Sequence, residues 1–205
     1  MSDEALPDDH DDLDAFDDAE ELFDAFPHLK AVPRLARLVA NLPWFQNIGI
    51  PANAGLYDIA ERYAVEIGLP DCRPVFLTET EDALAAALSN DINTEAWELE
   101  EQARAGLGNR ITEMLDEEIA SMVLTHLSEV SHAAIESGAR LAAVRQGLSD
   151  EDFVTAVVGA GVQAVHQAGL VALSGEEDHP FITRFRLFES GHWPIALVGT
   201  SFLIF

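Results

Sequence analysis

Cysteine and lysine are almost absent from this chain of 205 residues, which contains only Cys72 and Lys30 of these two types. Because one cysteine cannot form a disulfide within the chain, the disulfide framework of a small secreted protein is excluded. The first residues also lack the basic and then apolar order of a secretory signal. We therefore expect a cytoplasmic protein. No motif typical of a catalytic thiol surrounds Cys72, which favours an inert side chain.

Charge is absent from residues 153–175, a run long enough to cross a bilayer, which takes about 20 residues. However, Gln163, His166 and Gln167 interrupt this run, and alanine and glycine outnumber its large aliphatic residues. We expect a buried core helix here and no membrane partner.

Basic residues are few, with 11 Lys and Arg against 37 Asp and Glu, so the formal net charge is -26. Binding to nucleic-acid phosphates needs clustered bases, yet the densest basic spots are Arg34 with Arg37 and Arg184 with Arg186. The sequence also lacks a phosphate-binding glycine loop, a G-x-S-x-G elbow, an H-E-x-x-H helix and paired cysteines. We therefore expect no nucleic-acid partner and no cofactor.

What the chain has in excess is acid, and much of it lies at the start. Residues 1–26 contain twelve acids and no base, which leaves 25 acids and 11 bases, a net charge of -14, on the rest. A run of like charges repels itself and offers little to bury, so we predict a disordered acidic leader over residues 1–19. Residues 20–205 are long enough for a single globular domain. The acidity fits either salt adaptation or a binding surface.

The spacing of apolar residues predicts a mostly α (α+β) fold. Thr78 and Glu81 have the capping-box spacing that begins a helix, and the glycines at 106 and 108 are expected to end one. A short strand is expected near residues 75–77 and an ordered apolar loop near 42–51. Helices are expected, in chain order, over residues 20–26, 33–40, 54–67, 78–88, 94–106, 109–146 and 149–174.

We expect the two longest helices, 109–146 and 149–174, to pack as an antiparallel hairpin. The second has an alanine at every fourth position from Ala156 to Ala172, a ridge that lets a neighbouring helix approach closely. The first carries His126 within a broad apolar stripe. The stripe contains Leu115, Ile119, Met122, Val123, Val130, Ala133, Ala134, Leu141 and Val144.

After His179 the apolar residues alternate with a period of two, which is typical of strands. We predict strands over residues 181–188, 193–198 and 202–205, which would form a C-terminal three-stranded antiparallel β-meander. An edge strand could pair with a second copy of the chain and give a homodimer.

The aromatic and arginine side chains of this C-terminal region resemble the mixture found in protein interfaces. We therefore take Arg184, Arg186 and Trp193 as candidate partner-binding residues. The alternative interpretation is that the aromatic residues only pack a small core layer.

Glu129 and His132 have the E-x-x-H spacing with which four-helix bundles bind two iron ions. Glu118 and Glu136 lie near them on the helical wheel, so these four residues are the candidate metal ligands. The alternative interpretation is a solvated polar strip, because Glu136 precedes Arg140 by four residues and this spacing suits an ion pair.

A di-metal site would also need a second E-x-x-H motif, and the last helix offers only Gln163 and His166 at that spacing. An amide is a poor metal ligand compared with a carboxylate. The first functional hypothesis is therefore a non-enzymatic interaction protein that binds a basic protein partner, as an inhibitor or a neutraliser. The alternatives are a metal-dependent, di-iron-like enzyme centred on Glu129 and His132, and a purely structural subunit.

Overall fold

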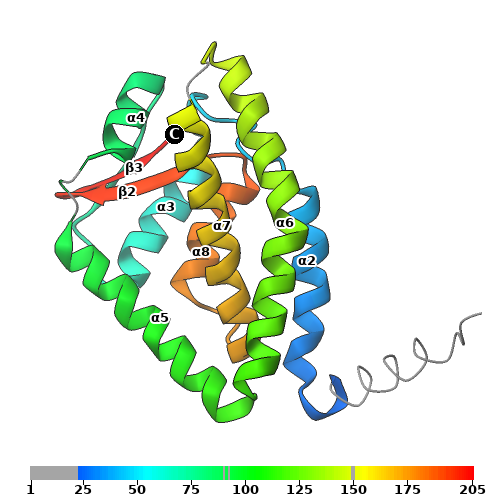
Figure 1. The fold of residues 1–205 in the computed structure, drawn as a ribbon. Coiled ribbons are helices and arrows are strands. Elements are labelled where there is room, and N and C mark those ends of the chain that lie inside the picture. The colour runs from blue at the N-terminus through cyan, green and yellow to red at the C-terminus, as the bar shows by residue number, and fades with distance from the viewer. Residues whose placement is uncertain (1–22, 90, 92, 149–150) are drawn as a thin grey trace, which may run out of the picture.

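The computed structural model describes residues 23–89, 91, 93–148 and 151–205, so the predicted leader over residues 1–19 lies outside the described residues. Within that part of the chain the fold is mostly α with a small β-sheet (Figure 1). The elements are η1 Pro27–Ala31, α2 Val32–Asn41, α3 Ala54–Glu66, β1 Arg73–Phe76, α4 Thr80–Ala87, α5 Thr94–Met114, α6 Glu117–Arg145, α7 Glu151–Ser174, α8 Pro180–Glu189, β2 Pro194–Val198 and β3 Ser201–Ile204.

Helix α7 is the centre of the fold, because α2, α5, α6 and α8 all pack against it. A helix surrounded in this way buries apolar residues around most of its circumference, which explains its run without charge. By length and composition, α7 is the one helix among the described residues that could cross a membrane, and 56% of its most apolar stretch is buried inside the fold.

Helices α6 and α7 form the predicted hairpin and lie side by side (Figure 1). Glycines make their close approach feasible: a Cβ at Gly161 would lie 2.8 Å from Ile135 Cγ2, and one at Gly169 would lie 2.9 Å from Leu124 Cδ2. Ala164, in the middle of the predicted ridge, is 5% exposed.

The boundary between α5 and α6 differs from the prediction. Helix α5 continues through Gly106 and Gly108, so these glycines do not end it. An added Cβ at either glycine would meet nothing within 4 Å. The break comes at Leu115, which has an extended backbone with φ -131° and ψ 148°.

The buried face of α6 also differs from the predicted stripe. Met122, Leu141 and Val144 are 62%, 52% and 73% exposed, and His126 is exposed too. The prediction placed the largest apolar residues on the buried face. In the structure α6 packs closely against α2 and α7, and mainly small residues fit on that face. The buried residues of α6 are Ala120, Leu127, Ser131, Ile135, Ala139, Ala142 and Ala143.

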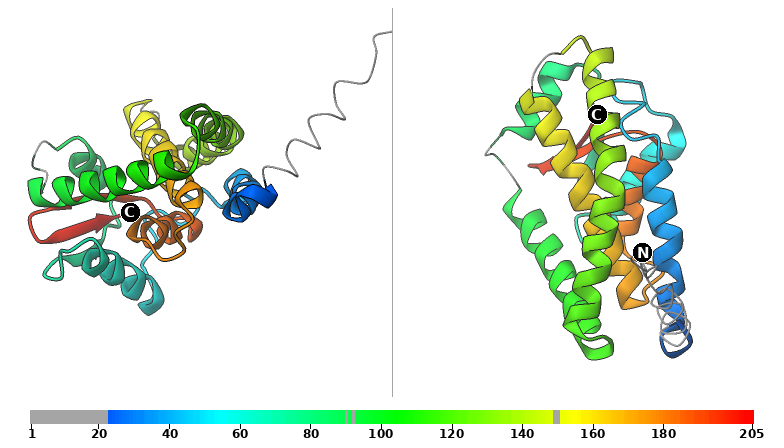
Figure 2. Two further views of the ribbon diagram at one scale, coloured as in Figure 1. Left: turned by 90° about the horizontal axis from the view of Figure 1, so that it is seen from below. Right: turned by 45° about the vertical axis from the view of Figure 1, so that its right-hand side comes forward.

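The strands form a mixed sheet with the order β1-β3-β2, which corrects the predicted antiparallel meander. β2 and β3 pair antiparallel, but the third strand is β1, which pairs parallel with β3. Residues 181–188 form the helix α8 instead of a strand. His179 caps this helix, since its Nδ1 accepts a hydrogen bond from the Phe181 amide at 3.2 Å. Seen from below, α5 and α3 lie on opposite sides of the strands (Figure 2).

Asparagines cap two helices for which no cap was predicted. Asn53 and Asn93 accept hydrogen bonds from the third residue after them at the starts of α3 and α5. The predicted capping box is wrong, because α4 begins at Thr80 with no side-chain cap and the Thr78 hydroxyl donates to Glu79 instead.

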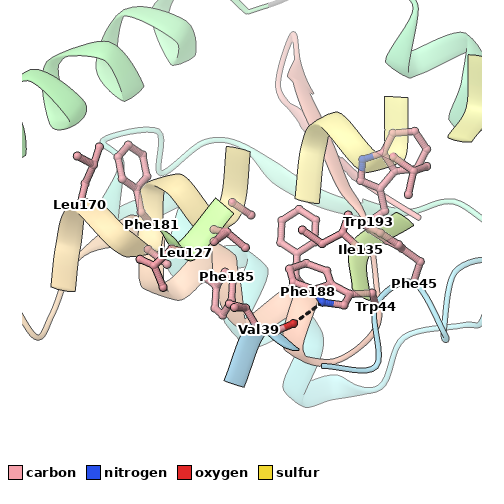
Figure 3. Packing of buried hydrophobic residues seen from close by; sticks show 14 of the residues in the cluster. Val39, Trp44, Phe45, Leu127, Ile135, Leu170, Phe181, Phe185, Phe188 and Trp193 are labelled. Atoms are coloured by element: carbon pink, nitrogen blue, oxygen red, sulfur yellow. Dashed lines mark hydrogen bonds between the residues drawn. The ribbon is translucent and has the colours of Figure 1, made fainter. Parts of the chain in front are cut away.

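The loop that follows α2, predicted to be ordered and apolar, contributes aromatic side chains to the core. Trp44 and Phe45 are 1% and 0% exposed, and the Trp44 indole donates to the Val39 carbonyl at 2.8 Å (Figure 3). These rings pack with Phe185 and Phe188 of α8 in the larger of two hydrophobic clusters. The smaller cluster lies among α3, α5, α8 and the sheet.

Candidate functional site

A pocket of about 400 Å³ opens between α4, α5, α7, α8 and β2. This volume lies toward the lower end of the range for small-molecule sites, about 300–1,000 Å³. Most of its walls are small or apolar side chains. The lining residues are Ala86, Ala87, Ser89, Asn93, Ala96, Trp97, Glu100, Ala156, Ala160, Gln163, Arg184, Trp193, Ile195, Ala196 and Leu197.

Asn93 fixes the start of α5 against the sheet and so positions one wall of this pocket. Its side chain caps the helix through Ala96 and donates to the Gly199 carbonyl at 2.7 Å. Its backbone amide donates to the Leu197 carbonyl at 3.0 Å. About two turns further along α5, Glu100 reaches the pocket.

Glu100 and Arg184 form an ion pair within the pocket lining. Arg184 Nη1 lies 3.3 Å from both carboxylate oxygens, and the two side chains are 17% and 11% exposed respectively. The Tyr63 hydroxyl, from α3, donates to Glu100 Oε1 at 2.5 Å. The three groups link α3, α5 and α8 through one hydrogen-bonded network.

Burial and charge set the protonation states of this network. Burial raises the pKa of Tyr63, and Glu100 raises it further, so the phenol stays neutral and acts as a donor. Burial opposes the charge of Arg184, but the attraction of Glu100 outweighs it and the pKa of the guanidinium is raised. The pocket therefore contains a charged guanidinium that is paired with a carboxylate.

Two donors of pocket-lining residues have no hydrogen-bond partner. Arg184 Nε and Trp193 Nε1 are both shielded from solvent, and neither has a hydrogen-bond partner within the part of the chain that the structure describes. An unpaired buried donor costs about 1–3 kcal/mol, so such groups are retained where something offsets the loss. Arg184 Nη2 makes only one long contact, 3.5 Å to the Pro194 carbonyl.

The structure brings two of the three candidate partner-binding residues together, since Arg184 and Trp193 both line the pocket. Arg186 does not belong to it and is exposed on α8. Sequence reasoning missed Glu100, Tyr63 and Trp97. No motif marks these three residues: Trp97 and Glu100 come from α5, and Tyr63 comes from α3 and meets Glu100 only through the fold.

The four candidate metal ligands lie on one helix, α6, and only two of them approach each other. His132 Nδ1 lies 4.0 Å from Glu136 Oε2. Glu136 also pairs with Arg140 at 3.0 Å, and Arg140 reaches Glu151 of α7 at 3.3 Å. Among the described residues, no three His, Cys, Asp or Glu side chains are placed to hold a metal ion together, and this includes Glu118 and Glu129.

A second hollow, of about 520 Å³, lies between α6 and α7 and has Glu129 and His166 in its lining. Burial lowers the pKa of His166, and Arg104 lowers it further. Glu117 is a third potential ligand in this lining. A structural metal site normally has four ligands, and no three such side chains among the described residues are placed to hold a metal ion together.

The groups around the main pocket favour binding over catalysis. Tyr63 is held neutral and Arg184 charged, while Glu100 already accepts hydrogen bonds from both. None of the three is thereby placed as a free base or nucleophile. No family model, curated protein or solved structure matches this chain.

Proposed function

We propose that this protein is a non-catalytic interaction protein whose acidic surface binds a basic protein partner. Strong negative charge attracts cationic proteins and repels nucleic acids, whose phosphates need clustered bases. The charge that supports the proposal is spread over the exposed surface and is not confined to the start of the chain.

The observation that carries the proposal is a set of exposed acids without counter-charges. Of the bases in the described residues, Arg34, Arg37, Arg73, Arg145 and Arg186 form no ion pair. Exposed acids that form no ion pair are far more numerous than these bases. The exposed ones in the described part of the chain are Asp58, Glu61, Asp71, Glu79, Glu81, Asp82, Asp91, Glu95, Glu98, Glu113, Asp116, Glu117, Glu118, Glu129 and Glu177.

An affinity capture experiment tests the proposal. The full chain is immobilised, exposed to lysate of its host at low salt, and washed with increasing salt. We expect a basic protein to be retained at low salt and released as salt rises, because exposed charge pairs are screened. An unrelated folded protein of similar size and net charge serves as the control. Equal retention of the same proteins by both would contradict the proposal.

Two charge-matched variants separate a specific interface from bulk ion exchange. One replaces Glu113, Glu117 and Glu118 with glutamine; the other replaces Glu61, Glu79 and Glu81 with glutamine. Both remove three charges, so ion exchange predicts equal losses of the captured protein. A specific interface predicts that one variant loses much more than the other.

Formation of a homodimer through the C-terminal strands stays a prediction. Because β3 is interior to the sheet, β2 is the C-terminal strand that lies at a sheet edge. Sedimentation of the full chain over a range of concentrations would measure it.

A further inference from the structure

The main pocket is electrically balanced although the protein as a whole is strongly acidic. Among the described residues, Glu100 and Arg184 are the only charged ones in its lining, and they carry opposite signs. The surrounding negative field would repel a ligand with a net negative charge. A ligand with a net charge of either sign would also leave an uncompensated charge in a mostly buried site. The pocket therefore favours a ligand that is neutral overall.

The ion pair has hydrogen-bonding capacity left on both partners. Counting only partners in residues 23–89, 91, 93–148 and 151–205, Arg184 Nη2 makes one long contact and Nε makes none, and Trp193 Nε1 is a further unpartnered donor. On Glu100, Oε2 accepts only from Arg184, although a carboxylate oxygen can accept more than one hydrogen bond. An acceptor and a donor on one ligand would complement these two sides.

The remaining walls call for an apolar body on that ligand. Ala86, Ala156 and Ala160 leave space because their side chains are small, and Ile195 and Leu197 supply apolar surface. Trp97 also lines the pocket and is 56% exposed. A ligand in the pocket would cover part of this exposed indole.

We propose that the pocket binds a small zwitterion with an apolar side chain, of the class of a free leucine- or phenylalanine-like amino acid. Its carboxylate lies against Arg184 and Trp193, its ammonium group against Glu100, and its side chain among the alanines and Trp97. The ligand has both charges, so the site stays neutral when it is occupied. The pocket and the acidic surface are separate features, and this binding does not depend on a basic protein partner.

Titration calorimetry of the full chain with L-phenylalanine and L-leucine tests the proposal. The matched probes are 3-phenylpropionate, which lacks the ammonium group, and 2-phenylethylamine, which lacks the carboxylate. We expect L-phenylalanine to bind, and both probes to bind at least about tenfold more weakly than L-phenylalanine. Absence of measurable binding by both amino acids would overturn the proposal, as would equal affinity for L-phenylalanine and either probe.

Variants of the walls connect binding to this pocket without touching the ion pair. Ala160→Phe places a ring in the cavity and should weaken amino-acid binding by about tenfold or more. Its control is Ala133→Phe, at an exposed position on α6 outside the pocket. Trp97→Ala should also weaken binding, whereas Leu88→Ala, at a 62% exposed residue outside the lining, should not. Folding is checked by circular dichroism, and unchanged affinity in both folded wall variants would assign the binding elsewhere and overturn the proposal.

Discussion

Gly138 shows at the scale of one residue how the absence of a side chain sets the packing of α6. An added Cβ there would lie 2.6 Å from Trp44 Cβ and 2.7 Å from the Trp44 carbonyl oxygen. Because one of these atoms belongs to the backbone, the contact cannot be relieved by a side-chain rotation. Arg145 of the same helix donates to the carbonyls of Phe45 and Gln46, which fixes the loop further.

We predict that Gly138→Ala destabilises the protein by about 1–3 kcal/mol, the usual cost of overpacking a close contact. The matched change Gly159→Ala on α7 meets nothing within 4 Å, so it should stabilise by up to about 1 kcal/mol through helix propensity. Urea unfolding of both variants and the wild type measures the difference. If Gly138→Ala proves as stable as Gly159→Ala, the loop of Trp44 is not held against α6.

His192 is a buried group whose environment fixes its protonation state. It is 3% exposed, and its Nδ1 lies 3.0 Å from Ser190 Oγ. The Ser190 hydroxyl donates its hydrogen to the Leu187 carbonyl at 2.6 Å, so the neutral imidazole carries its hydrogen on Nδ1. Burial lowers the pKa of His192 in the folded protein.

This lowered pKa predicts a pH dependence with a definite sign. In the unfolded chain His192 takes up a proton near the ordinary histidine pKa of 6.5, whereas folded His192 resists protonation. The effect of His192 on stability therefore becomes unfavourable as the pH falls below that value. The variant His192→Gln has no imidazole, so it does not lose stability in this way as the pH falls. Urea unfolding at pH 8, 7, 6 and 5 should show that the stability advantage of the wild type over the variant shrinks with falling pH. A constant difference across the series would contradict it.

At the scale of elements, the alanine ridge of α7 tests how tightly the central helix is packed. Ala164 is 5% exposed, so Ala164→Leu should destabilise by about 1–3 kcal/mol through strain. Ala164→Gly should cost about 1 kcal/mol from helix propensity alone. The control is Ala133→Leu at an exposed position on α6, which should change little. The midpoint of urea unfolding measures these changes in stability. A midpoint for Ala164→Leu equal to that of the wild type would show that Ala164 lies outside the core.

The helical hairpin could be predicted from the sequence because long helices contain many repeats of their period. Helix α8 could not, and its residues explain why. Phe181 and Phe185 are four apart, a spacing that lies on one face of both a strand and a helix. The N-terminal cap by His179 was the local signal that distinguished them. The parallel pairing of β1 with β3 joins segments far apart in the chain, and no local pattern specifies such a pairing.

The candidate site was predictable only in part, for a related reason. Arg184 and Trp193 stood out as an arginine and an aromatic residue in one short segment. Glu100 and Tyr63 join them through the packing of α5 and α3, and neither belongs to a motif. On α6 the residues that did form a motif, Glu129 and His132, lie on an exposed helical surface.

At the scale of the whole molecule, the fold combines a neutral pocket with a strongly negative surface. The central helix carries no charge between Phe153 and its end, so the acids are distributed over the helices around it. Such a distribution adds little to stability, because exposed ion pairs are worth only about 0–1 kcal/mol each. Its physical consequence lies in long-range attraction and solubility.

We predict that the rate at which the basic partner associates depends on salt. If the surface charge steers the encounter, the association rate should fall steeply between 0.01 M and 0.15 M salt, as the Debye length shrinks from about 30 Å to about 8 Å. Stopped-flow measurements with the captured partner give this rate at each salt concentration. The variant with Glu113, Glu117 and Glu118 replaced by glutamine should show a shallower slope, because it carries three fewer negative charges. The rival explanation is that the charge serves only solubility, and it predicts no specific partner. An association rate independent of salt would show that charge does not guide the encounter.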